Sequence, residues 1–108
     1  MVIMRGDATS IPVDPKYNGQ ILTPDMIADM ELSIEKSISK LYSAGEVWFD
    51  KVAMRWYFRL TQEETFSMRP AKYRVIARVK FPGAENFDVN GFSVGDIIVQ
   101  QTFSERVL

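Results

Sequence analysis

The chain has 108 residues, of which 46% are apolar and 25% are charged, and its formal net charge is −1. These proportions exclude a disordered chain, the length fits one domain spanning residues 1–108, and the charge gives no overall attraction to nucleic acid or to an anionic membrane. The sequence has no cysteine and no histidine, which removes disulfides, thiolate metal sites and the commonest general base.

Alternation of apolar and polar residues predicts strands with one buried and one solvent-facing side. The first runs from Ala8 to Val13, where Pro12 indicates a sheet edge because proline has no N–H to donate. Thr23-Pro24-Asp25-Met26 then predicts a short helical turn, with proline directly after a capping threonine. Further strands are expected, in chain order, at Met30 to Glu35, Ile38 to Tyr42, Glu46 to Phe49, Met54 to Leu60, Tyr73 to Phe81 and Val94 to Phe103.

The segments between the strands carry turn and capping residues. Thr61-Gln62-Glu63-Glu64 matches a capping box, in which the Thr61 hydroxyl and the Glu64 carboxylate each accept a backbone N–H of the other. This interpretation accounts for the paired glutamates better than an acid/base pair, which needs a partner in a pocket. The predicted turns are at Asn18-Gly19, Ala44-Gly45, Pro82-Gly83 and Asn90-Gly91.

About seven short strands with this spacing predict an all-β fold, an immunoglobulin-like β-sandwich with Greek-key connections and short helical turns. Tyr73, after the capping box, matches a tyrosine corner, whose hydroxyl bonds the backbone a few residues upstream and fixes a crossover between sheets. The alternative is an ordinary strand tyrosine. The residues expected to form the shared core are Trp56, Phe58, Val75, Val79 and Leu32.

The register of one hairpin decides what surrounds the second tryptophan. If Phe49 pairs with Met54 across a four-residue turn at Asp50 to Ala53, the side chain of Trp48 lies on the solvent side. In that register Trp48 faces Arg55 on the neighbouring strand.

Two interpretations of Trp48 follow from this position. One is a cation–π contact with Arg55, which stabilises by about 0.5–1 kcal/mol. The other is a sugar-binding or protein-binding platform that Trp48 forms together with Tyr57. Trp48, Arg55 and Tyr57 are therefore candidate interaction residues.

Residues 51–80 contain eight basic and two acidic side chains, a local excess that suggests a nucleic-acid face. An immunoglobulin-like strand order instead places Glu31 and Glu35 opposite two arginines of a neighbouring strand. Those arginines are Arg55 and Arg59. Because such pairing explains the charge, and no nucleic-acid motif is present, neither nucleic acid nor a membrane is an expected partner. No apolar run approaches the roughly 18 residues of a membrane span.

No catalytic, cofactor or metal site is predicted. The sequence has no Gly-rich phosphate loop, G-x-S-x-G or EF-hand spacing. Calcium binding by carboxylates alone stays open for Asp7, Asp25, Asp29 or Asp88, although their spacing matches no known site. Arg5-Gly6-Asp7 matches the integrin-binding tripeptide, but three residues recur by chance, and the glycine more simply marks the start of the first strand.

Several of these motifs together resemble small virion proteins of tailed phages and prophages of Gram-positive bacteria. Among such proteins, the chain resembles the N-terminal immunoglobulin-like domains of phage baseplate upper proteins. The chain differs from this family in two respects. Ala71-Lys72 replaces the usual glycine before the corner tyrosine, and the chain ends directly after the last expected strand. The motifs are Arg5-Gly6-Asp7, Asn18-Gly19, Leu22-Thr23-Pro24-Asp25, Leu60-Thr61-Gln62-Glu63-Glu64-Thr65 and Tyr73-Arg74-Val75.

This resemblance implies a non-enzymatic structural or assembly module in a phage tail, baseplate or head. Such a module is made in the cytoplasm of the bacterial host, enters the virion and binds other virion proteins. The chain end favours a compact adaptor or decoration protein over a holder of receptor-binding proteins. The competing class is a stand-alone carbohydrate-binding module that uses Trp48 and Tyr57.

The closing segment supplies the remaining candidate interaction residues, Phe103, Val107 and Leu108. We expect these apolar side chains to bind a second copy, which gives a weak homo-oligomer, or a virion partner. The alternative is that the segment folds back on its own domain, because burial of such side chains stabilises by about 1.5–3 kcal/mol each wherever it occurs.

Overall fold

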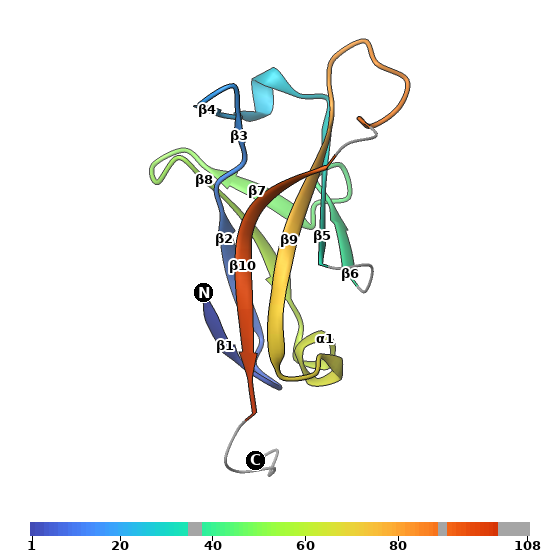
Figure 1. Ribbon diagram of the computed structural model, residues 1–108. Coiled ribbons are helices and arrows are strands. Elements are labelled where there is room, and N and C mark those ends of the chain that lie inside the picture. The colour runs from blue at the N-terminus through green and yellow to red at the C-terminus, as the bar shows by residue number, and fades with distance from the viewer. Residues whose placement is uncertain (35–37, 89–90, 102–108) are drawn as a thin grey trace.

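The computed structural model describes residues 1–34, 38–88 and 91–101. Over these residues the regular secondary structure consists of ten strands, one short α-helix and one 3-10 helix (Figure 1). The predicted all-β class is confirmed.

Each of the seven predicted strands overlaps a strand of the structure, and three short strands are additional. The predicted helical turns are present as η1 (Pro24–Met26) and α1 (Gln62–Ser67). The strands are β1 (Val2–Met4), β2 (Thr9–Val13), β3 (Lys16–Tyr17), β4 (Gln20–Ile21), β5 (Asp29–Ile34), β6 (Ile38–Leu41), β7 (Val47–Asp50), β8 (Arg55–Leu60), β9 (Ala71–Lys80) and β10 (Phe92–Gln100).

The strands of the described residues form two larger sheets and one ribbon. The five-stranded sheet has the order β1-β10-β9-β5-β6, and the three-stranded sheet has the order β2-β8-β7. The β3–β4 ribbon and η1 lie at one end of the molecule, and α1 lies at the other (Figure 1). Pro12 lies on the edge strand β2, as predicted.

The expectation that the strand at Met30 to Glu35 lies beside the strand at Met54 to Leu60 is wrong. β5 pairs with β6 and β9 in the five-stranded sheet, whereas β8 pairs with β2 and β7 in the other sheet.

The inward side chains of both sheets form one hydrophobic cluster around Trp56. The Trp56 ring is completely buried and lies 5.3 Å from Tyr42 and 5.2 Å from Phe49, measured between ring centroids. Its Nε1–H donates to the C=O of Leu22 at 2.6 Å, so the one polar atom of the ring is satisfied. The predicted core is confirmed, since Trp56, Phe58, Val75, Val79 and Leu32 are each at most 2% exposed.

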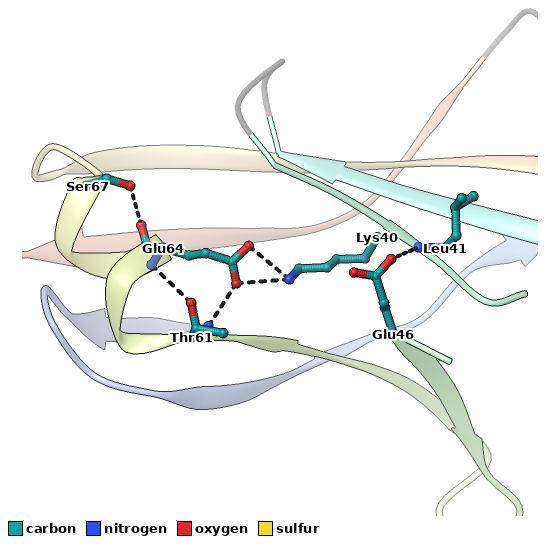
Figure 2. Close-up of polar contacts among 6 residues, drawn as sticks. All are labelled: Lys40, Leu41, Glu46, Thr61, Glu64 and Ser67. Atoms are coloured by element: carbon teal, nitrogen blue, oxygen red, sulfur yellow. Dashed lines mark hydrogen bonds and ion pairs between the residues drawn. The ribbon is translucent and has the colours of Figure 1, made fainter. Parts of the chain in front are cut away.

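The crossover from β8 to β9 has the predicted capping and corner contacts. The N–H of Thr61 donates to Oε1 of Glu64, and the N–H of Glu64 donates to the Thr61 hydroxyl (Figure 2). The hydroxyl of Tyr73 donates to the C=O of Arg69, four residues upstream, at 2.7 Å. Both ends of the crossover are therefore fixed by side-chain hydrogen bonds, as the sequence predicted.

Candidate interaction surface

The outward face of the three-stranded sheet carries a row of three large side chains. The ladder places Pro12 of β2 opposite Tyr57 of β8, and Tyr57 opposite Trp48 of β7. Residues directly opposite in a ladder share a face, and the strand neighbours of all three are buried or half-buried on the core side. Trp48 is 40% exposed. Tyr57 and Trp48, whose rings lie side by side next to Pro12, are called the aromatic row below.

Trp48 stacks on Tyr57, and the predicted contact with Arg55 is wrong. The two ring centroids are 6.0 Å apart and the ring planes differ by 15°. The hairpin closes with Asp50 opposite Arg55, so the four-residue turn spans 51–54, one residue later than predicted. Trp48 still faces solvent, as predicted. The shift moves its cross-strand partner by two residues, from Arg55 to Tyr57, and residues two apart on a strand share a face.

The turn chemistry explains this register. The Asp50 carboxylate accepts the N–H groups of Val52 and Ala53 at 2.9 and 3.3 Å, which fixes the start of the turn. Met54 has a φ of 53° and therefore ends the turn in the left-handed region. Because left-handed backbone interrupts a strand, β8 begins at Arg55 and not at Met54.

Arg55 is bound to an acidic partner that the sequence did not predict. Its Nε and one terminal nitrogen donate to the two carboxylate oxygens of Asp14, each at 3.0 Å. These hydrogen bonds raise the pKa of the Arg55 guanidinium above its ordinary value. Both side chains stay about 40% exposed, so the pair orients Arg55 along one side of the aromatic row more than it stabilises the fold.

The other acidic group near the aromatic row is Asp50, which lies two residues after Trp48 on β7 and therefore on the same face. Glu46 precedes β7, and its carboxylate accepts the N–H of Leu41 on the other sheet at 3.2 Å, so it is not part of this face. Sequence reasoning missed Asp14 and Asp50 as parts of this surface, although the correct register would have placed Asp50 opposite Arg55.

The basic segment 51–80 is balanced by acidic neighbours other than those predicted. Glu31 lies opposite Arg78 on β9, not opposite Arg55, and Asp29 lies opposite Lys80. Glu35 lies outside the described residues. Acidic residues therefore do lie opposite basic ones in the ladder, but on a different strand from the one predicted.

β9 also forms an ion pair with its other neighbour, β10. The Lys72 ammonium lies 3.6 Å from a carboxylate oxygen of Asp96 on β10. Arg74 is the ladder partner of the same aspartate. Acidic residues on both neighbours of β9 therefore accompany its basic side chains.

Some of the remaining candidate residues form contacts within the fold, and the others lie outside the described residues. Nε of Arg5 donates to the C=O of Phe66 at 2.7 Å, so the tripeptide at 5–7 is held within the fold. Among the described residues no group of three or more acidic side chains is arranged to hold a metal ion. Phe103, Val107 and Leu108 lie outside the described residues, and their binding role stays a prediction.

Comparisons with protein-family models, curated proteins and solved structures gave no match. In the described part of the chain, no helix has the length and apolar character needed to cross a membrane.

Proposed function

We propose that this chain is an immunoglobulin-like Greek-key sandwich that binds another protein through the β2–β8–β7 face and catalyses no reaction. The strand order supports this fold assignment. β5–β6, β7–β8 and β9–β10 are antiparallel neighbours in sequence, and the chain changes sheet between one pair and the next. The hydrogen bond from Tyr73 to Arg69 lies at the crossover where this fold class places its corner tyrosine.

The aromatic row carries the proposal for function. Tryptophan and tyrosine are enriched at the centres of protein interfaces, where they supply large contact areas with few rotatable bonds. Here the rings project from paired strands, so little conformational entropy is lost when a partner covers them. Flanking charges on Asp14, Arg55 and Asp50 provide the polar rim that such interfaces have.

The proposed partner is another virion protein of a phage tail, baseplate or head. This part of the proposal rests on the turn and capping motifs that resemble baseplate upper proteins. The capping box and corner tyrosine among those motifs are formed as hydrogen bonds in the described structure. A protein with a structural role in a particle needs a rigid binding surface and no reactive group. The aromatic row meets this requirement.

Quantitative mass spectrometry of purified phage particles from the encoding strain tests this proposal. The double variant Trp48→Ser/Tyr57→Ser should reduce the amount of the chain per particle at least about tenfold, because interface aromatics often contribute 2 kcal/mol or more. Val52→Ser is the matched control, since Val52 is 96% exposed in the adjoining turn. Absence of the wild-type chain from particles, or normal incorporation of the folded double variant, would contradict the proposal.

A carbohydrate-binding module is the second candidate, and the geometry of the two rings favours it specifically. Trp48 and Tyr57 are nearly parallel on one open face, Asp50 lies opposite Arg55 in the same ladder, and Arg55 binds the carboxylate of Asp14. Sugars stack on such rings and donate hydroxyl hydrogens to carboxylates. A dose-dependent rise in melting temperature with an oligosaccharide, abolished by Trp48→Ser, would place this function before protein binding.

A further inference from the structure

The peptide group between Leu22 and Thr23 is held from both sides by side chains. Its C=O accepts the indole Nε1–H of Trp56 at 2.6 Å, and its N–H donates to the sulfur of Met26 at 3.4 Å. The C=O and N–H of a trans peptide point in opposite directions. Because Trp56 is fully buried and Met26 is 39% exposed, this one peptide plane connects the centre of the core with a thioether at the surface.

Met26 occupies a capping position that normally carries an oxygen acceptor. In a capping box the third helical residue is usually Glu or Gln, whose side chain accepts the N–H of the N-cap residue. Glu64 does so at α1, where its carboxylate lies 2.9 Å from the N–H nitrogen of Thr61 (Figure 2). At η1 a thioether sulfur, which is a weak acceptor, takes this place, and the N–H of Met26 donates back to the C=O of Thr23 at 3.0 Å. Of these two capping boxes, the one at η1 has an acceptor atom that oxidation changes.

The methionines of the chain differ widely in their access to an oxidant. Met30 and Met68 are at most 4% exposed, whereas Met26, Met54 and Met1 are between 39% and 48% exposed. An oxidant in solution reaches an exposed sulfur sooner than a buried one. Among the three exposed methionines, Met26 is the one whose sulfur accepts a backbone hydrogen bond within the described residues.

We propose that Met26 is a site of reversible oxidation by hydrogen peroxide, and that the Leu22–Thr23 peptide group transmits this change to Trp56. A lone pair of the sulfur attacks one peroxide oxygen, so that an S–O bond forms, the O–O bond breaks and the other oxygen leaves as water. The sulfur is oxidised by two electrons to the sulfoxide, and the peroxide is reduced. Methionine sulfoxide reductases reverse such a change.

The sulfoxide has a local effect because Met26 lies at the surface. Oxidation converts an apolar side chain into a polar one, whose oxygen turns to water and needs no unfolding to reach it. The N–H of Thr23 then loses its acceptor, and the peptide plane is held only through the bond to Trp56, which weakens. None of these residues belongs to the aromatic row, so the site is independent of the function proposed for that surface.

The experiment treats the whole chain with dilute hydrogen peroxide and follows the indole N–H signals by NMR, while mass mapping of peptides identifies each sulfoxide. Oxidation of Met26 should shift the Trp56 indole signal. It should also speed hydrogen exchange of that N–H about three- to tenfold, the change expected when one neutral hydrogen bond is weakened. Subsequent treatment with methionine sulfoxide reductases should restore both the signal and the exchange rate.

Two variants separate Met26 from the other exposed methionines. Met26→Leu has no sulfur at this position, so peroxide should leave its Trp56 signal and exchange rate unchanged. Met54→Leu is the matched control, because Met54 is 48% exposed and lies in the β7–β8 turn. Its Trp56 signal should respond to peroxide as in the wild-type chain, while its Trp48 signal stays in place.

Four results would overturn the inference. Met26 could stay reduced while Met54 is oxidised, or become oxidised without any change at Trp56. The Met26→Leu variant could respond to peroxide as the wild-type chain does, which would assign the response to another residue. Loss of the folded spectrum on oxidation of Met26 would show that its sulfur is required for folding and is not a local switch.

Discussion

At the residue scale, Glu64 performs two tasks in one position. Its carboxylate accepts the N–H of Thr61 to cap α1, and both of its oxygens lie 2.9 Å from the ammonium of the buried Lys40 (Figure 2). Burial by itself raises the pKa of Glu64, but the hydrogen bonds from Thr61 and Lys40 outweigh it, and the pKa lies below its ordinary value. The charged carboxylate therefore stabilises the fold.

The variant Glu64→Gln tests this coupling through its pH dependence. A lowered pKa contributes stability above the unfolded-state pKa near 4.5, and this contribution is lost as the pH falls through the folded-state pKa. At pH 7 the variant should lose about 1–2 kcal/mol of unfolding free energy, and this loss should become smaller as the pH falls through the lowered folded-state pKa, because the wild-type carboxyl then becomes neutral as well. Chemical denaturation at a series of acidic pH values is the measurement. Glu63→Gln should change little across the series, and a loss for Glu64→Gln that does not shrink with falling pH would contradict the coupling.

At the element scale, the β7–β8 hairpin shows how a turn determines a surface. Met54 has a φ of 53°, where most side chains are strained, and it is about half exposed. The turn that it closes sets Asp50 opposite Arg55 and thereby Trp48 opposite Tyr57. The pairing of Trp48 with Tyr57 therefore depends on the backbone conformation of Met54.

Met54→Gly should raise the free energy of unfolding by up to about 1 kcal/mol, because glycine adopts left-handed backbone without strain. Val52→Gly, in the same turn at ordinary φ, should instead lower it by about 0.5–1 kcal/mol, because glycine only adds freedom to the unfolded chain there. Chemical denaturation of the two variants separates the effects. A loss of stability in both would show that Met54 is not strained.

The same hairpin shows what the sequence could predict. Alternation placed Trp48 and Tyr57 outside and Trp56 inside, because a period of two follows directly from strand geometry. It did not give the register, since Asp50 and Met54 fix the turn through backbone angles that residue types only suggest. β1 was missed because its three residues are all apolar and show no alternation, and its pairing with β10 joins the two ends of the chain.

At the scale of the whole molecule, the two sheets are joined at the α1 end by polar contacts as well as by the core. The segment between β1 and β2 passes from one sheet to the other and lies against α1, which joins β8 to β9 (Figure 1). The Arg5 guanidinium lies 4.9 Å from the centroid of the Phe66 ring. Sequence reasoning found no signal for these contacts, because residues about 60 positions apart meet only after the sheets have formed.

Thr65 is the centre of this junction, and its replacement tests how firmly the sheets are joined there. Its fully buried hydroxyl donates to the C=O of Asp7 at 2.7 Å and accepts the N–H of Gly6 at 3.1 Å. Thr65→Val keeps the shape of the side chain and leaves both backbone groups without a partner, so it should cost about 1–3 kcal/mol of unfolding free energy. Thr65→Ser keeps the hydroxyl and should cost less than about 1 kcal/mol.

Denaturation curves should give these costs, and hydrogen exchange should show faster exchange of the Gly6 amide in the valine variant alone. If valine and serine have equal effects, or the Gly6 amide stays protected in the valine variant, packing joins the sheets at this end and the hydrogen bonds are incidental. If the order is as expected, the first strand is held by α1, and loosening the junction should expose the β1 amides before those of β8 and β9.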